Sequence, residues 1–219
     1  MHITISNSIK EKWNNTVLGV ITADVEYQKA NVLLKEQLDL LEASIKESII
    51  IEDIAKMQAI SNTRAAYRAF GKEPARYRVS SEALTRRIVQ GKGLYYINNI
   101  VDTNNLVSIK SGYALCCFDM DKIDGDVEFT IAKPGSSYKG IGKGELNIEF
   151  LPVFRDSIGY FGSPTSDSQR TMITNTTKRL LFVIVSFSGE ADLQDQLTHA
   201  KESLETYCSA NIHSLEVVG

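Results

Sequence analysis

The feature that most constrains the fold of this chain is an apolar run, LLFVIVSF, at Leu180–Phe187. A strand whose alternating side chains are apolar on both sides must be covered on both faces, as in the middle of a buried sheet. The run is far too short to cross a lipid bilayer, which takes about 20 apolar residues in a helix. We therefore predict that Leu180–Phe187 is the central strand and that the other elements cover it.

The rest of the chain shows helical and strand patterns in turn. Within Tyr27–Ile60, five apolar residues recur at spacings of 4, 3, 4 and 4, which places them on one helix face. In Val127–Ala132, apolar and polar residues alternate, as in a half-buried strand. The other predicted helices are Ser61–Phe70, Ser80–Gln90 with Ser80 or Ser81 as its cap, Val101–Ser111 with Asp102 or Thr103 near its cap, and Glu190–Ser209; the other predicted strands are His2–Ser6, Val17–Val25, Leu115–Phe118, Leu146–Phe150, Ile158–Phe161 and His213–Val218.

The order of these elements predicts an α+β fold with a mixed central sheet or a partly closed barrel, flanked by helices. A chain of 219 residues is long enough for one large domain, and no proline- or serine-rich linker divides it. We expect two parts with one core. Residues 1–75 form an N-terminal strand and helical elaboration, and residues 76–219 form the main domain.

Cysteine usage and the N-terminal sequence indicate a reducing compartment. The three cysteines, Cys116, Cys117 and Cys208, cannot all pair and show no CxxC spacing. Adjacent cysteines on a strand point to opposite faces, which disfavours a shared metal ion. The N-terminal residues MHITISNSIKEKW lack a basic region followed by an apolar one, as a signal peptide would have. We expect a cytoplasmic protein without membrane attachment, metal or cofactor.

Charge is distributed unevenly along the chain. The formal net charge is −3, yet residues 64–92 contain eight Lys or Arg and two Glu, hence +6, which leaves −9 for the remainder. A basic patch on an acidic body fits a protein that neutralises the phosphates of a nucleic acid. The alternative is a solvated helix face that pairs with the acidic N-terminal helices. Charge alone leaves both interpretations open.

Short polar side chains are concentrated in the stretch from Gly91 to Asp119, GKGLYYINNIVDTNNLVSIKSGYALCCFD. It contains Asn98 and Asn99, then Asp102-Thr103-Asn104-Asn105, and then an apolar strand. Such side chains compete locally for backbone hydrogen bonds, so a cluster of them is typical of a helix cap or a lined cleft. By chemistry alone, this stretch predicts a pocket with a strand at its rim.

The segments INNIVDTNNLVS and CFDMDKI within and just after this stretch resemble the tRNA-editing domain of the phenylalanyl-tRNA synthetase beta subunit, the B-three/B-four module. The resemblance extends from about Arg76 to about Phe187, roughly half of the chain. The module also occurs as free-standing proteins, and this chain is similar to those in length. The residues of this chain that match the family in order and spacing are Arg86-Arg87, Ile97-Asn98, Val101-Asp102, Asn105, Phe118-Asp119 and Lys122-Ile123.

The resemblance implies a second-sieve pocket that positions a water molecule against the ester of a wrongly attached amino acid. It implies a catalytic role for Asn104, Asn105 and Cys116. Three residues depart from the family pattern: Asn104 replaces a threonine, Cys116 a histidine that organises the water, and Val183 a glutamate that reads a tyrosine hydroxyl. The substrate-binding residues that it implies are Asn98, Phe118, Asp167, Gln169 and Val183.

The same resemblance, together with the local charge, predicts an RNA-binding surface. The glycine-rich segment Gly135–Gly144 is expected to be a flexible hairpin, because its sequence lacks the order of a phosphate-binding loop. The resemblance implies that this hairpin borders the cleft. The predicted RNA-binding residues are Arg76, Arg78, Arg86, Arg87, Lys92, Lys139 and Lys143.

Two hypotheses for the function remain open at this point. The first is a free-standing RNA-binding hydrolase that removes the amino acid from mischarged tRNA in trans, as part of translation quality control. The second is a module that keeps the cleft without chemistry and binds tRNA, an amino acid or a protein. Nothing in the sequence resembles the ATP-binding core of a complete ligase. The expected partner is tRNA or aminoacyl-tRNA, not DNA.

Overall fold

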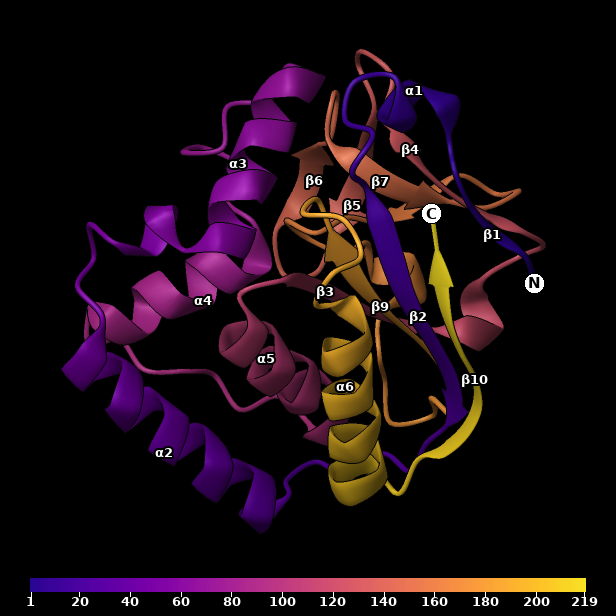
Figure 1. The fold of residues 1–219 in the computed structure, drawn as a ribbon. Helices are drawn as coiled ribbons and strands as arrows, with labels where there is room; N and C mark the ends of the chain where they lie inside the picture. The colour runs from indigo at the N-terminus through magenta and orange to yellow at the C-terminus, as the bar shows by residue number, and fades with distance from the viewer.

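Two four-stranded sheets share an apolar core in the computed structural model, which describes all residues from Met1 to Gly219 (Figure 1). The first sheet has the order β10-β2-β9-β3 and is antiparallel throughout. The second has the order β1-β4-β7-β8, in which only β1 and β4 are parallel. The strands of the first sheet are β2 (Val17–Asp24), β3 (Ala114–Asp119), β9 (Arg179–Ser186) and β10 (Asn211–Val218); those of the second are β1 (Ile3–Ile5), β4 (Val127–Ile131), β7 (Pro152–Arg155) and β8 (Tyr160–Gly162).

The predicted central strand is confirmed as β9, which lies between β2 and β3. Its side chains point alternately to two apolar clusters. Leu181, Val183 and Val185 enter the cluster between the two sheets, while Leu180, Phe182 and Ile184 enter the cluster under the helices. The run is apolar on both sides because both faces of the first sheet are covered.

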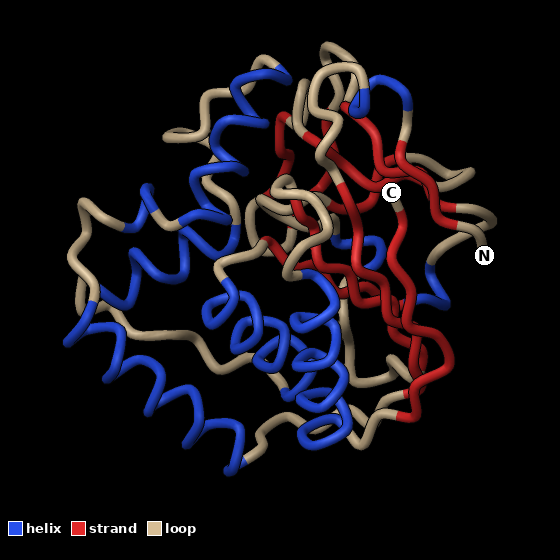
Figure 2. The backbone as a smooth tube through the Cα atoms, in the orientation of Figure 1, coloured by secondary structure: helices blue, strands red, loops and turns tan.

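The longer helices gather on one side of the molecule and most strands on the other (Figure 2). Helices α5 (Asn99–Ser111) and α6 (Leu193–Cys208) lie side by side and cover the first sheet. Helix α2 (Val32–Ser48) packs on α4 (Ser80–Val89) and on α5. Helix α3 (Gln58–Phe70) contributes Tyr67 and Phe70 to the core between the sheets. The short elements are α1 (Asn7–Lys10), the 3-10 helices η1 (Ile54–Lys56), η2 (Met120–Lys122) and η3 (Gln169–Thr171), and the hairpin β5 (Ser137–Gly140) with β6 (Gly144–Asn147).

These elements confirm the predicted α+β class with a mixed sheet, and the sheets do not close into a barrel. The predicted helical pattern of Tyr27–Ile60 splits, because α2 ends at Ser48 and a turn precedes η1 and α3. Strand β7 was missed, and the strand predicted at Leu146–Phe150 is reduced to the end of β6. Strand β7 is only four residues long, so its sequence is too short to show a clear alternation of apolar and polar side chains.

Two predicted helix caps are wrong. The residue before α4 is Val79, no side chain caps that helix, and the Ser80 amide instead donates to the Pro164 carbonyl at 2.8 Å. Helix α5 begins two residues earlier than expected, and its cap is Asn98, whose side chain accepts from the Val101 amide at 2.9 Å. A distant segment thus holds the start of α4, whereas the residue that directly precedes α5 caps that helix.

The N-terminal residues are part of the same core. Strand β2 pairs along its whole length with β9 and β10, and Ile3, Ile9 and Phe70 lie in the cluster between the sheets. The two parts that we expect to divide near residue 75 therefore share one core, and the division itself stays a prediction. None of the helices combines the length and the apolar character needed to span a membrane.

Candidate functional site

A cavity of about 200 Å3 lies where helix α5 meets the edge strand β3 and the serine-rich loop after β8. Helix α5 contributes Asn104 and Asn105, and β3 contributes Leu115 and Cys117. We call this space the asparagine cavity. Its other lining residues are Ser80 and Val101, the loop residues Ser163, Pro164, Thr165, Ser166 and Asp167, and the two isoleucines Ile141 and Ile173.

The first turn of α5 is anchored by the polar residues that precede the cavity. Asp102 accepts from the Ile97 amide at 3.0 Å and 3.2 Å, and Asn99 accepts from the Gln28 amide at 2.8 Å. Asn99 also donates to the carbonyls of Glu26 and Tyr207. Burial raises the pKa of Asp102 to about 6, against the effect of the hydrogen bond from Ile97. The polar cluster thus divides into residues that hold the helix and two asparagines that face the cavity.

Asn104 presents an acceptor that no protein group satisfies. The residue is only 6% exposed, and its Oδ1 atom is buried without a hydrogen-bond partner. The Ser80 hydroxyl, which also lines the cavity, is unpartnered as well. Leaving a buried polar atom unpaired costs about 1–3 kcal/mol, so a water or ligand that brings a donor is favoured here.

Asp167 supplies the carboxylate of the cavity. It is half-buried, and the Ser163 amide donates to its Oδ1 at a long 3.4 Å. Burial raises the pKa of Asp167 to about 7, against the opposing effects of that hydrogen bond and of the Lys143 charge. A carboxyl group that titrates near neutral pH in a pocket is suited to general acid–base chemistry.

The asparagine cavity is walled on one side by the hairpin β5–β6. The Tyr138 hydroxyl donates to the Ser166 carbonyl, and the Ile141 amide donates to the Asp167 carbonyl at 3.2 Å. Gly140 forms an isolated bridge with Ser168. The predicted hairpin therefore borders the cavity, and these contacts tie it to the loop that carries Asp167.

Replacing Asp167 with asparagine is expected to stabilise the protein at high pH. A folded pKa near 7, above the unfolded value of about 4, means that Asp167 destabilises the fold progressively as pH rises from about 4 to about 7. Because the residue as a whole is only half-buried, we expect Asp167→Asn to gain about 1–3 kcal/mol at pH 8 and nearly nothing at pH 4. Urea denaturation at both pH values measures this. Glu36→Gln, an exposed change on α2, is the control, and an equal gain at both pH values contradicts the prediction.

A second concave surface adjoins the cavity and is lined by cations. It has a volume of about 420 Å3, and no acidic residue lines it. We call it the basic hollow. Thr165 lines both spaces, and Lys143 Nζ donates to the Ser166 hydroxyl of the cavity at 3.0 Å. The cations that line the hollow are Arg76, Arg78, Arg86, Arg87, Lys92 and Lys143.

The buried carboxylate of Glu82 holds some of the arginines of this surface in place. Its side chain is fully buried and accepts from Arg64 at 2.9 Å and 3.0 Å and from Arg86 at 2.9 Å. Arg78 lies farther away, at 3.8 Å. Arg76 and Lys92 are exposed and have no acidic partner within ion-pair distance. Arg64, Arg78 and Arg86 thus share one buried glutamate of helix α4, and no ion pair joins the basic segment to the acidic residues of the N-terminal helices.

Three predicted pocket residues do not line the cavity. Cys116 and Val183 are partners across β3 and β9, and both lie with Phe118 in the apolar cluster between the sheets. The expectation that they shape the cavity is wrong, because side chains alternate along β3 and the cavity opens on the opposite face. Cys117 lines it instead. Burial holds the pKa of both thiols well above the usual range, so neither is a thiolate nucleophile at neutral pH.

The remaining predicted residues lie around the site in other roles. Asn98 is the buried cap of α5, and Gln169 begins η3 outside the lining of the cavity. Lys139 is exposed on β5 and does not line the basic hollow. Asp167, which the resemblance placed at the pocket, does line the cavity, and its loop also supplies Thr165 and Ser166. Sequence reasoning missed Cys117, although the alternation of side chains along a strand could have indicated it.

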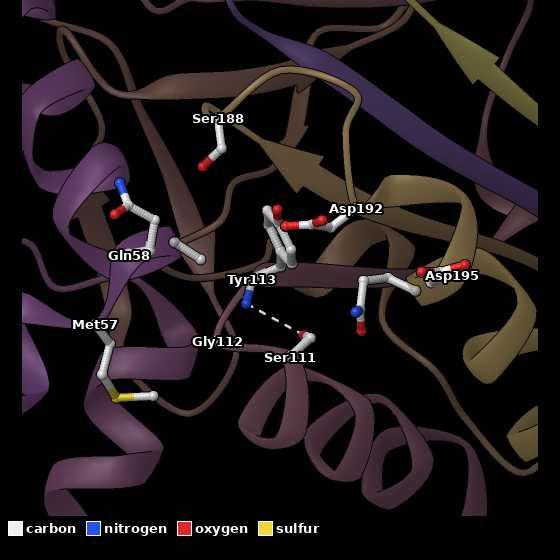
Figure 3. Close-up of a pocket in the computed structure, with 10 residues that line it drawn as sticks. Met57, Gln58, Ser111, Gly112, Tyr113, Ser188, Asp192 and Asp195 are labelled. Carbon is white, nitrogen blue, oxygen red and sulfur yellow. Dashed lines mark hydrogen bonds between the residues drawn. The ribbon is translucent and has the colours of Figure 1, made fainter.

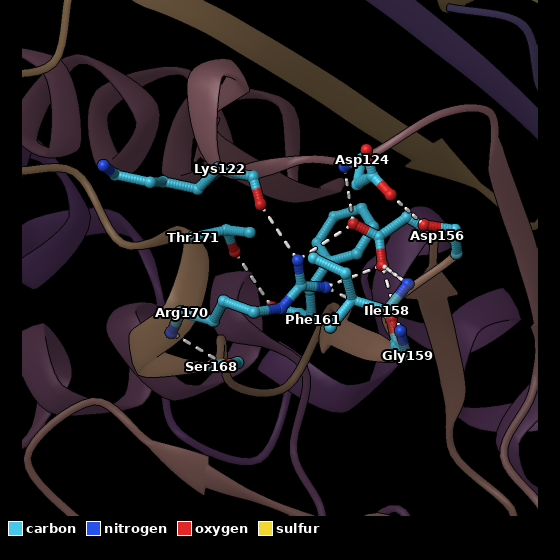
Figure 4. Close-up of polar contacts among 10 residues, drawn as sticks. Lys122, Asp124, Asp156, Ile158, Gly159, Phe161, Ser168, Arg170 and Thr171 are labelled. Atoms are coloured by element: carbon cyan, nitrogen blue, oxygen red, sulfur yellow. Dashed lines mark hydrogen bonds and ion pairs between the residues drawn. The ribbon is translucent and has the colours of Figure 1, made fainter.

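The neighbouring Arg170 is held by a buried ion pair (Figure 4). Its guanidinium makes two hydrogen bonds of 2.9 Å to the fully buried Asp156 side chain and one of 2.9 Å to the Lys122 carbonyl. Burial would raise the pKa of Asp156, but hydrogen bonds from Arg170 and from the amides of Asp124 and Gly159 together hold it below its usual value. Arg170 therefore fixes the end of the cavity loop and is not free to contact a ligand.

A separate polar pocket of about 270 Å3 lies between the starts of α3 and α6 (Figure 3). Gln58, Tyr113 and Ser188 line it together with Asp192 and Asp195. Its carboxylates repel a polyanion, so charge directs a nucleic acid to the basic hollow. Nowhere in the structure do three or more His, Cys, Asp or Glu side chains form a group that could hold a metal ion.

Comparison with known proteins gives one consistent result. The family model of the B3/4 domain matches residues 62–206. The phenylalanine–tRNA ligase beta subunit of Mycoplasma pneumoniae is 30% identical over 118 residues, which is 51% of this chain and 14% of that protein. The corresponding subunit of Fusobacterium nucleatum is 29% identical over 105 residues, 47% of this chain and 13% of that protein. The chain thus spans a small part of the curated relatives that it matches.

The fold has a solved counterpart. An N-terminal fragment of the phenylalanyl-tRNA synthetase beta subunit from Pyrococcus horikoshii superposes with a TM-score of 0.50 at 15% identity. The match covers 96% of this chain and 50% of that one, so the likeness includes the N-terminal residues that the family model leaves out. At this level of identity the likeness concerns the fold alone.

Proposed function

Because the chain belongs to the B3/4 domain family, as its sequence predicted, we propose that it binds the 3′ end of aminoacyl-tRNA and hydrolyses the ester in trans. The observation that carries this proposal is the adjacency of the basic hollow and the asparagine cavity, which share Thr165. A charged tRNA end has the same two parts, a phosphate backbone followed by an esterified amino acid. The activity would serve translation quality control in the cytoplasm, where tRNAs are charged.

The basic hollow is suited to the phosphates. Six cations and no acidic residue line it, so each phosphate that binds displaces a counterion and strengthens association at low salt. Lys143 lies at the boundary, because it lines the hollow and donates to Ser166 of the cavity at 3.0 Å. A backbone that follows these cations leads its last nucleotide towards Thr165 and the cavity.

The asparagine cavity is suited to the amino acid and one water molecule. Its volume of about 200 Å3 exceeds the ~30 Å3 that one water occupies in the liquid. The unpartnered Oδ1 of Asn104 accepts a hydrogen bond from water or from the substrate ammonium group, and the side-chain amide of Asn105 can donate to the ester carbonyl. These two roles position the attacking water and polarise the carbon that it attacks.

Asp167 is the group in the cavity that can accept the proton. The water oxygen attacks the ester carbon, and Asp167 takes the proton that the water loses. The bond from that carbon to the ribose oxygen then breaks, and the proton passes to the leaving ribose hydroxyl. Since the pKa of Asp167 is about 7, the rate should rise with pH up to about 7 and then level off.

The experiment is a deacylation assay on a panel of mischarged tRNAs. We expect one or a few to be hydrolysed, and we expect Asn105→Ala to lower the rate by ~10²-fold, as the loss of one polarising donor does in other hydrolases. Asn175→Ala, an exposed asparagine away from the cavity, is the matched control and should keep the full rate. An Asn105→Ala protein that folds and hydrolyses at the rate of the parent would remove Asn105 from the mechanism.

A second candidate function, binding without hydrolysis, is favoured by one specific observation. The cavity is lined by no histidine, and Cys116, which the resemblance puts in place of a family histidine, lies in the apolar core with Val183. A protein of this kind would bind tRNA and hydrolyse no member of the panel. The same assay, combined with a tRNA-binding measurement, therefore separates the two candidates.

A further inference from the structure

We propose that Tyr95 and Arg87 form a stacking platform for an unpaired RNA base at the rim of the basic hollow. The proposal rests on the proposed function in one respect, that the bound polyanion is RNA. It adds a position that recognises a base, whereas the hollow itself recognises phosphates. Tyr95 lies in the segment between α4 and α5, directly after the cations Arg87 and Lys92 that line the hollow.

The geometry of the pair is that of a cation stacked on an aromatic ring. The Arg87 guanidinium carbon lies 3.9 Å from the centroid of the Tyr95 ring. Arg87 Nη2 also donates to the Lys92 carbonyl at 3.2 Å, which holds the guanidinium in place over the ring. Tyr95 nevertheless remains 62% exposed, so the guanidinium covers only part of the ring surface. A nucleobase can stack on the remainder while Arg87 contacts the adjoining phosphate.

The segment that carries Tyr95 is held at both ends. The Leu94 amide donates to Glu42 Oε2 at 3.2 Å, and the Ile97 amide donates to Asp102 at 3.0 Å. The ring therefore occupies a defined position before a ligand arrives, which lowers the entropy lost on binding. A preorganised, exposed aromatic ring among cations is the arrangement with which proteins bind single-stranded nucleic acid.

The adjacent Tyr96 differs from Tyr95 because its side chain is held by contacts with helix α2. Its hydroxyl donates to Asp39, and Lys35 lies over its ring at 5.0 Å, so it is bound to helix α2. Tyr96 does not line the basic hollow. It provides a matched control in sequence position, residue type and partial exposure.

The test compares the full chain with its Tyr95→Ala, Tyr95→Phe and Tyr96→Ala variants. Affinity is measured by fluorescence anisotropy for tRNA with its unpaired 3′ end and for the same tRNA with that end paired to a complementary oligonucleotide. We expect Tyr95→Ala to weaken binding of the unpaired end by about 5- to 100-fold. Tyr95→Phe should bind like the parent because the ring is kept, and Tyr96→Ala should bind RNA like the parent.

The two RNAs and the control separate the possible results. A 2-aminopurine placed in the unpaired end should lose fluorescence on binding to the parent protein and keep it with Tyr95→Ala. Unchanged affinity of Tyr95→Ala for the unpaired end overturns the stacking platform and leaves the proposed function standing. An equal loss for the paired and the unpaired end also overturns it. Failure of the parent protein to bind either RNA overturns both proposals.

Discussion

Replacing Glu82 with alanine is expected to lower the free energy of unfolding by about 3–5 kcal/mol, because the change leaves buried positive charge without a partner. The Glu82 side chain is 0% exposed and accepts three hydrogen bonds of 2.9–3.0 Å from Arg64 and Arg86. Those arginine side chains are only 16% and 22% exposed, so water compensates little for the lost carboxylate. The contact joins helix α3 to helix α4, and its loss should also loosen the surface that carries the hollow.

Chemical denaturation of three variants measures this effect. Glu82→Gln keeps the shape and an acceptor but removes the charge, so it should destabilise by less than Glu82→Ala. Glu36→Ala, at an exposed position of α2, removes a glutamate of the same size and should change stability by less than about 0.5 kcal/mol. If Glu82→Ala unfolds within about 1 kcal/mol of the parent, the arginines reach water on their own and the buried pair is unimportant.

Reversing two charges of the basic hollow is expected to cause the largest loss of RNA binding. Arg76 and Lys92 are the natural positions, because both are exposed and neither has an acidic partner, so the change leaves the fold intact. The variant Arg76→Glu/Lys92→Glu should lose about 10- to 100-fold in affinity for tRNA near 0.15 M salt. The slope of log affinity against log salt concentration should become shallower by about 1.5, as two phosphate contacts are lost.

A second double variant controls for the change in total charge. Lys133→Glu/Lys139→Glu alters the net charge by the same amount at two exposed lysines that do not line the hollow. It should keep most of the affinity and nearly the whole salt dependence. If both double variants lose affinity equally, the net charge of the protein attracts tRNA and the basic hollow is not its specific binding site. That result would also restore Lys139 to the predicted RNA-binding set.

Much of the fold was predictable because it depends on short-range patterns. The apolar run at Leu180–Phe187 predicted β9, since a strand that is apolar on both sides has to lie between two covered faces. The helix predicted at Ser80–Gln90 ends before Gly91, whose φ of 72° lies in the left-handed region that glycine adopts without strain. The asparagine-rich stretch was expected to form a helix cap or a lined cleft, and Asn104 lines a cavity, whereas the cap is Asn98 and not Asp102 or Thr103.

The errors arose where a distant segment decided the outcome. Cys116 and Cys117 are equally apolar in sequence, and only the register of β3 on β9 decides which of them faces the cavity. The start of α4 is held by the Pro164 carbonyl and not by its own serines. Glu82 lies in the first turn of α4, and only the packing of α3 on α4 buries it between arginines from two helices.

Periodicity, turn residues and charge are properties of neighbouring positions, so most elements, the family and the excess of positive charge before the asparagine stretch were predictable from the sequence. The cations that line a common surface and the lining of the cavity became known from the folded chain. The tertiary structure brings Asn104, Thr165 and Asp167 together through the packing of α5, β3 and the loop after β8. That arrangement depends on cross-strand register and on contacts between distant segments, which no local pattern encodes.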